Sequence, residues 1–101
     1  MTDSRIDPFM NSLINRVDEL INGVKAIKNY QYDNMCTDYL RSLRRERNDL
    51  YSQWEKLFNL PKESRDTFDI IDYADKQNKI IDGMYQTLLY LKSRAPIKNP
   101  Y

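Results

Sequence analysis

The sequence predicts an all-α protein, an elongated antiparallel three-helix bundle with coiled-coil-like heptad packing. Two observations predict this fold class. Apolar residues recur at helical spacing in three long segments, and no alternating run typical of a β-strand is present. We expect a single helical domain over residues 1–94 and an extended C-terminal tail over residues 95–101, because two prolines there oppose a helix.

The first helix is expected over residues 8–28. Asp7 followed by Pro8 indicates its start, since Asp caps helices and proline suits the first helical position. The apolar residues that follow are spaced alternately four and three apart, a heptad seam that keeps one stripe of the helix against its neighbours. The seam consists of Ile6, Met10, Leu13, Val17, Leu20, Val24 and Ile27. Residues 29–34 break the pattern and supply turn and capping residues.

The second helix is expected over residues 34–59 and ends at Leu60, because the residue before Pro61 is pushed out of the helical region. Its apolar stripe is interrupted between Leu43 and Leu50, where Glu46 and Arg47 place charge in the seam. Such a layer can fix helix register or oligomeric state. Alternatively, the helix turns so that only the stem of Arg47 packs.

The third helix is expected over residues 66–93, with Asp66 as the cap and Asp69 completing a capping box three residues later. Residues 61–64 could form a separate helical turn. The stripe again alternates four and three, through Ile70, Ala74, Gln77, Ile81, Met84, Leu88 and Leu91. The tail beyond it is either a disordered terminus or a docking peptide.

Composition argues against most enzyme classes. The chain has 16 basic and 15 acidic residues, so its net charge is close to zero. It has no histidine, which excludes serine-type catalytic triads, Cys–His pairs and most zinc sites. Only 2 glycines occur, which excludes glycine-rich phosphate loops. The single Cys36 is expected to be a buried apolar residue and fits a reducing compartment. With no secretory signal and no membrane span apparent, we expect a cytoplasmic protein, in the host cytoplasm if it is viral.

One basic stretch could bind nucleic acid. It consists of Arg41, Arg44, Arg45 and Arg47, with Lys56 further along the same helix. Arginines near tyrosines can grip phosphates and stack bases. Acidic residues are interleaved, however, and Arg45 with Asp49 is spaced for a helical ion pair. We therefore favour solvent-exposed or intramolecular ion pairs and keep nucleic-acid binding as the alternative function.

A series of aspartates could bind a metal ion. Asp66, Asp69, Asp72 and Asp75 are three residues apart, so some of them share a helix face and could hold Mg²⁺ in a helical nucleotide hydrolase. Asp is also common at helix N-termini, where it opposes the macrodipole. We expect the second role, with no catalytic residue, cofactor or metal, and keep the Asp69, Asp72 and Asp75 hydrolase as a third hypothesis.

Aromatic residues give the leading functional hypothesis. One narrow seam cannot bury all of those in the turn and second helix, and Tyr and Trp anchor protein interfaces. We predict a non-enzymatic adaptor, inhibitor or assembly factor that binds a protein, for example a host protein, through an apolar-aromatic helix surface. A second copy is the first partner expected, giving a homodimer. The predicted interface comprises Tyr30, Tyr32, Tyr51, Trp54, Phe58, Arg41, Arg44, Arg45 and Arg47. The composition, rich in Asn, Tyr, Ile and Asp, resembles that of small phage or viral accessory proteins.

Overall fold

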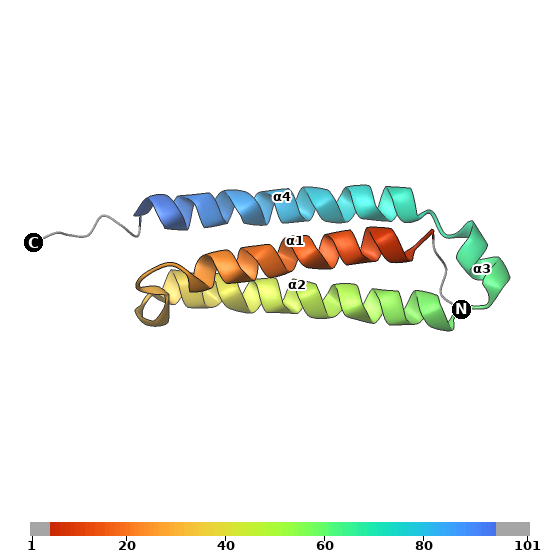
Figure 1. Cartoon of the computed structure of the whole chain (residues 1–101), viewed down its shortest axis with the longest axis horizontal. Coiled ribbons are helices and arrows are strands. Elements are labelled where there is room, and N and C mark those ends of the chain that lie inside the picture. Colours follow the sequence, from red (N-terminus) through yellow and green to blue (C-terminus); the bar gives the residue numbers. More distant parts are fainter. Residues whose placement is uncertain (1–4, 95–101) are drawn as a thin grey trace, which may run out of the picture.

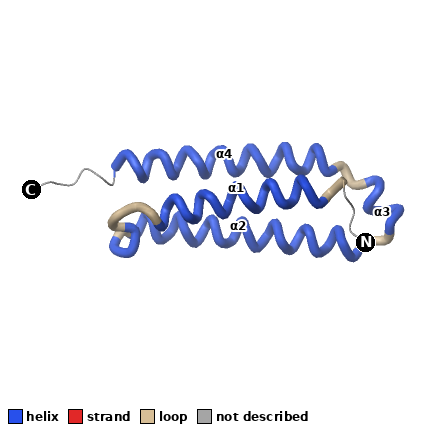
Figure 2. Tube along the Cα trace, in the orientation of Figure 1, coloured by secondary structure: helices blue, strands red, loops and turns tan. Residues whose placement is uncertain are grey.

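The computed structural model describes residues 5–94, and every regular element among them is helical. Three long helices, α1 (Asp7–Lys25), α2 (Asn34–Asn59) and α4 (Ile70–Arg94), lie side by side (Figures 1 and 2). A 3-10 turn, η1 (Tyr30–Tyr32), joins the first two, and the short α3 (Lys62–Thr67) joins the last two. The all-α class is therefore confirmed. The expected tail over residues 95–101 lies outside the described residues.

Helix α1 is the shared neighbour of the other two long helices. Both α2 and α4 pack along it, and they approach each other at few places. All seven apolar residues of the predicted seam, from Ile6 to Ile27, are buried, and Val17 has no exposed surface. Ile6 and Ile27 lie just outside α1, which ends at Lys25 and not at the expected residue 28. Close packing on α4 uses Gly23, where an added Cβ would stand 2.8 Å from Leu88 Cδ2.

Polar contacts tie α2 and α4 together in the half of the molecule near the α1–α2 turn. Asp33 caps α2 by accepting hydrogen bonds from the backbone N–H groups of Met35 and Cys36, at 2.8 and 3.3 Å. The same carboxylate pairs with Arg94 at the end of α4, which holds the pKa of Asp33 below its ordinary value. Between these helices, the Tyr39 hydroxyl donates to the Met84 carbonyl at 2.5 Å, and burial raises the pKa of Tyr39 to about 12.

Two helix starts differ from the expected ones. Asp7 is inside α1 and caps nothing; its carboxylate accepts a hydrogen bond from Trp54 Nε1 instead, at 2.9 Å. Asp66 does not begin the last helix. It lies in α3, and α4 begins at Ile70, where Asp69 accepts from the backbone N–H of Asp72 at 2.9 Å. By sequence, either Asp66 or Asp69 could cap the last helix. Because the chain leaves helical geometry at residues 68–69, Asp69 takes this role.

The described chain is narrow, with extents of 62 × 19 × 17 Å. A body this thin leaves large apolar side chains on its surface, among them Met35, Tyr51, Phe58, Ile80 and Tyr90. None of the helices within residues 5–94 is long and apolar enough to cross a membrane. The exposed apolar side chains are therefore the starting point for the functional site.

Candidate functional site

Three aromatic side chains gather on α2 near its C-terminal end. Tyr51, Trp54 and Phe58 are spaced three and four residues apart, so they share the flank of α2 that adjoins α1. We call them the aromatic patch. Tyr51 is 50% exposed and Phe58 is 52% exposed, whereas Trp54 is half-buried against the core. The patch thus combines one anchored ring with two accessible ones.

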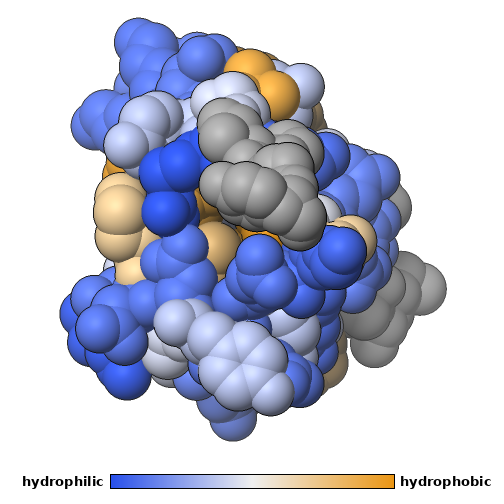
Figure 3. Space-filling model, turned by 90° about the vertical axis from the view of Figure 1, so that its left-hand side faces the viewer, coloured by the Kyte–Doolittle hydropathy of each residue, from blue (hydrophilic) through white to orange (hydrophobic). Residues whose placement is uncertain are grey.

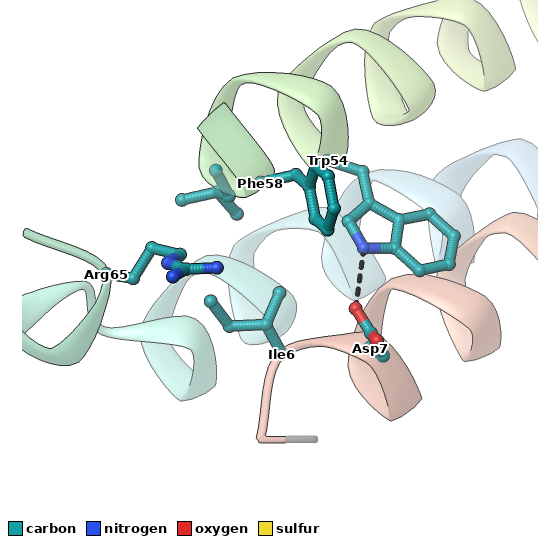
Figure 4. A pocket seen from close by; sticks show the side chains of 6 residues that line it. Ile6, Asp7, Trp54, Phe58 and Arg65 are labelled. Atoms are coloured by element: carbon teal, nitrogen blue, oxygen red, sulfur yellow. Dashed lines mark hydrogen bonds between the residues drawn. The ribbon is translucent and has the colours of Figure 1, made fainter. Parts of the chain in front are cut away.

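Trp54 is held in place by the start of α1. Its indole N–H donates to Asp7, and Figure 4 shows this bond with Phe58 and Ile6 close by. The gap enclosed by Trp54, Ile6, Phe58 and Arg65 has a volume of about 10 Å³, barely one water molecule. The inner edge of the patch is therefore well packed, and the bond to Asp7 orients the Trp54 ring.

The outer edge of the patch is open. Tyr51, Trp54 and Phe58, with Asp7 and Glu55 on its rim, line a shallow depression of about 290 Å³. Apolar rings surrounded by carboxylates form the pattern of a small protein-binding surface, in which aromatic groups give contact area and rim charges set orientation. Sequence reasoning missed Asp7 and Glu55, because Asp7 resembled a helix cap.

The predicted arginines do not form one cluster with these rings. Arg44 and Arg47 continue the line of the patch toward the N-terminus at spacings of three and four, and Arg47 pairs with Asp18 of α1 at 3.2 Å. Arg41 pairs with Asp38 at 3.0 Å. Arg45 falls on another face of α2, and in residues 5–94 it makes no ion pair with Asp49.

The tyrosines of the turn lie at the opposite end of the molecule. Tyr30 packs partly against the core, and Tyr32 is 87% exposed. Figure 3 looks onto this end, where most of the visible surface is hydrophilic. The part of α2 from its start at Asn34 to Trp54 separates these tyrosines from the aromatic patch by roughly 30 Å. The structure therefore does not bring the predicted interface residues into a single surface.

The charged layer of α2 divides between the two neighbouring helices. Arg47 pairs with Asp18 of α1, whereas Glu46 lies near Tyr73 of α4. Burial raises the pKa of Tyr73 to about 12, and the negative charge of Glu46 adds to this shift. The Glu46 Oε2 atom is buried without a hydrogen-bond partner. Burial, and then the nearby Asp49, raises the pKa of Glu46 above 4.5.

The aspartate series is engaged in helix contacts. Asp66, Asp72 and Asp75 pair with Lys62, Lys76 and Lys79 at 3.1–3.3 Å, and Asp69 caps α4. Among residues 5–94, no three metal-binding side chains come together. Cys36 is buried, and burial raises the pKa of its thiol, which disfavours the reactive thiolate.

Comparison of the chain with protein-family models, with curated proteins and with solved structures found no significant match.

Proposed function

We propose that this protein is a non-enzymatic helical binding protein whose aromatic patch docks on a partner protein. The observation that carries the proposal is the open depression at Tyr51, Trp54 and Phe58, next to a tryptophan that is already held by Asp7. A fixed aromatic anchor loses little conformational entropy on binding, which favours affinity from a small contact area. An adaptor, an inhibitor and an assembly factor would all use such a surface.

The rim indicates the polarity of the partner. Asp7 and Glu55 border the depression, and Asp7 keeps free carboxylate capacity beyond the bond to Trp54. Basic groups around an apolar centre on the partner would therefore complement this surface. Arg44, further along the same flank, could meet an acidic group there.

The test uses the tagged full-length chain to capture its partner from the native host, followed by affinity measurement with the identified partner. Joint Trp54→Ala and Phe58→Ala changes should weaken binding by about 100-fold, since each hot-spot truncation costs about 1–2 kcal/mol. Because Trp54 also packs on the core, Tyr51→Ala with Phe58→Ala provides a second variant that leaves it intact.

A matched control removes exposed apolar groups elsewhere. Ile71→Ala with Tyr90→Ala, both on the surface of α4, should leave the affinity unchanged. If the patch variants have a lower melting temperature but bind the partner with normal affinity, the rings serve the core and the proposal fails.

The nucleic-acid alternative rests on exposed Arg44, Arg45 and Lys56, which carry no ion pair within residues 5–94. Phosphate contacts weaken steeply with salt, so a mobility-shift titration at two salt concentrations tests it directly. A lack of any shift at micromolar protein would remove this alternative. The magnesium hydrolase stays the third hypothesis, and incubation of nucleoside triphosphates with Mg²⁺ tests it. Within residues 5–94, Asp72 and Asp75 pair with lysines and Asp69 caps α4, so an ion would have to compete with these contacts.

We further propose that the three long helices form an antiparallel bundle with coiled-coil-like heptad packing. We also propose that the protein is located in the cytoplasm of a cell or of an infected host. The buried seam of α1 supports the packing, and the lone Cys36 supports a reducing compartment. The suggested phage or viral origin rests on composition alone.

A further inference from the structure

A row of exposed polar side chains runs along the outward face of α2. Its members are spaced alternately four and three residues apart, so they share one face of the helix. We call this row the charged stripe. It consists of Asp38, Ser42, Arg45, Asp49, Ser52 and Lys56. All six are exposed, and the row is separate from the flank that carries the aromatic patch.

The order of charges along the stripe is self-complementary. A second copy of α2 can be laid antiparallel so that the two-fold axis passes midway between Arg45 and Asp49 of the stripe. Asp38 then faces the partner's Lys56, and Arg45 faces the partner's Asp49. The two-fold axis repeats each of these pairs, so four opposite-charge contacts form and no like charges meet. Ser42 faces the partner's Ser52, and side chains this small let the helices approach closely.

The charges needed for these contacts are available. Within residues 5–94, Arg45, Asp49 and Lys56 have no ion pair, although Arg45 and Asp49 are one turn apart. Other pairs at that spacing do form, such as Lys76 with Asp72 at 3.1 Å. Among the residues that the structure describes, the one ion pair of Asp38 is with the exposed Arg41 at 3.0 Å. Such an exposed pair has small energetic value, and a contact with the partner's Lys56 would replace it.

An open groove lies beside the N-terminal half of the stripe. It has a volume of about 580 Å³ between α2 and α4, and Asp38 and Ser42 of the stripe belong to its lining. Met35 and Ile80 add apolar surface that is 49% and 48% exposed. Gly83 leaves further room, since an added Cβ there would have no atom within 4 Å.

The same pairing fills this groove. It brings the C-terminal turns of the partner's α2 over the groove, with the exposed Leu60 of the second copy opposite Met35. The two-fold axis produces this apolar contact at both ends of the stripe. Charge pairs would then fix the register in the middle, and apolar contacts would close the two ends.

We propose that the chain forms a symmetric dimer in which the charged stripes of two copies lie antiparallel. Each copy covers the α2–α4 groove of the other. This surface is separate from the aromatic patch, so the dimer presents two patches to other partners and does not depend on the proposed function.

Charge reversal tests the dimer, with sedimentation velocity measured from about 1 µM to about 1 mM protein. The natural chain should associate with increasing concentration. Arg45→Glu and Asp49→Lys should each weaken association about tenfold or more, because two contacts become repulsive. An equimolar mixture of these two variants should associate again, since each reversed charge then meets its opposite.

Two controls separate the stripe from other surfaces. Arg44→Glu makes the same charge change on the flank next to α1 and should leave association unchanged. Joint Tyr51→Ala and Phe58→Ala changes should also leave it unchanged, whatever they do to other partners. Circular dichroism checks that every variant is folded.

The proposal is overturned by a natural chain that stays monomeric over the whole range. It is equally overturned if the single reversals associate normally, if their mixture stays monomeric, or if loss of the aromatic patch abolishes the dimer.

Discussion

The centre of α1 offers the most direct test of how the fold is held together. Val17 is fully buried where α2 and α4 both pack on α1, so Val17→Asp places a carboxylate in the seam with no partner. Loss of the buried valine costs about 1.5–3 kcal/mol. An unpaired buried charge adds about 3–5 kcal/mol. Stability for a chain of 101 residues is about 5–15 kcal/mol, so the substitution removes a large share or all of it.

The assay is urea unfolding followed by circular dichroism at 222 nm, a wavelength that reports helix. Val17→Ala serves as a graded companion and should cost about 2 kcal/mol. With a urea slope of about 1–3 kcal/mol per molar, that loss lowers the midpoint by about 1 M. The control Asn15→Asp adds the same charge to the exposed side of α1 and should move the midpoint little. A Val17→Asp midpoint close to that of Asn15→Asp would refute the packing argument.

Two further predictions concern the seam and the glycines. Glu46→Met should stabilise the protein at pH 7 by about 1 kcal/mol, because it replaces a buried, unpaired carboxylate oxygen with an apolar group. The raised pKa of Glu46 means that its ionisation destabilises the folded chain. This contribution is absent below the unfolded pKa of 4.5, grows as pH rises from there to the folded pKa, and is constant above the folded pKa. Urea titrations from pH 4 to 7 should therefore show the gain of the variant growing with pH, and a constant gain would contradict this. Gly83→Ala should raise the free energy of unfolding by about 1 kcal/mol, because alanine favours the helix and its Cβ meets no atom there. Gly23→Ala should raise it less or lower it, because its Cβ would meet Leu88. Equal shifts in the melting temperatures of the two variants would contradict this contrast.

The seam could be predicted from sequence because heptad spacing and burial are two expressions of the same geometry. Every seam residue of α1 is buried, and α2 spans the expected range, since Pro61 leaves one place for it to end. The starts of the helices were harder to predict from the sequence. Several aspartates can cap equally well, and tertiary contacts decide, as Trp54 does when it takes Asp7.

The candidate site was only partly predictable for a related reason. Spacing alone places Tyr51, Trp54 and Phe58 in line and separates Arg45 from them. Grouping the arginines by sequence proximity therefore joined two different faces of α2. How far each ring is exposed depends on the position of α1, which the local sequence does not encode.

The central place of α1 also has a consequence for how the chain reaches its folded state. The hairpin of α1 and α2 joins neighbouring segments, so it can close early and at low loop entropy. Helix α4 returns to α1 only after the chain has passed through α2 and α3, so we expect its contacts with α1 to form later, because they close a longer loop. As the last helix described, α4 can also leave without breaking the α1–α2 hairpin. Local opening of this protein should accordingly begin with α4 leaving a surviving helical hairpin.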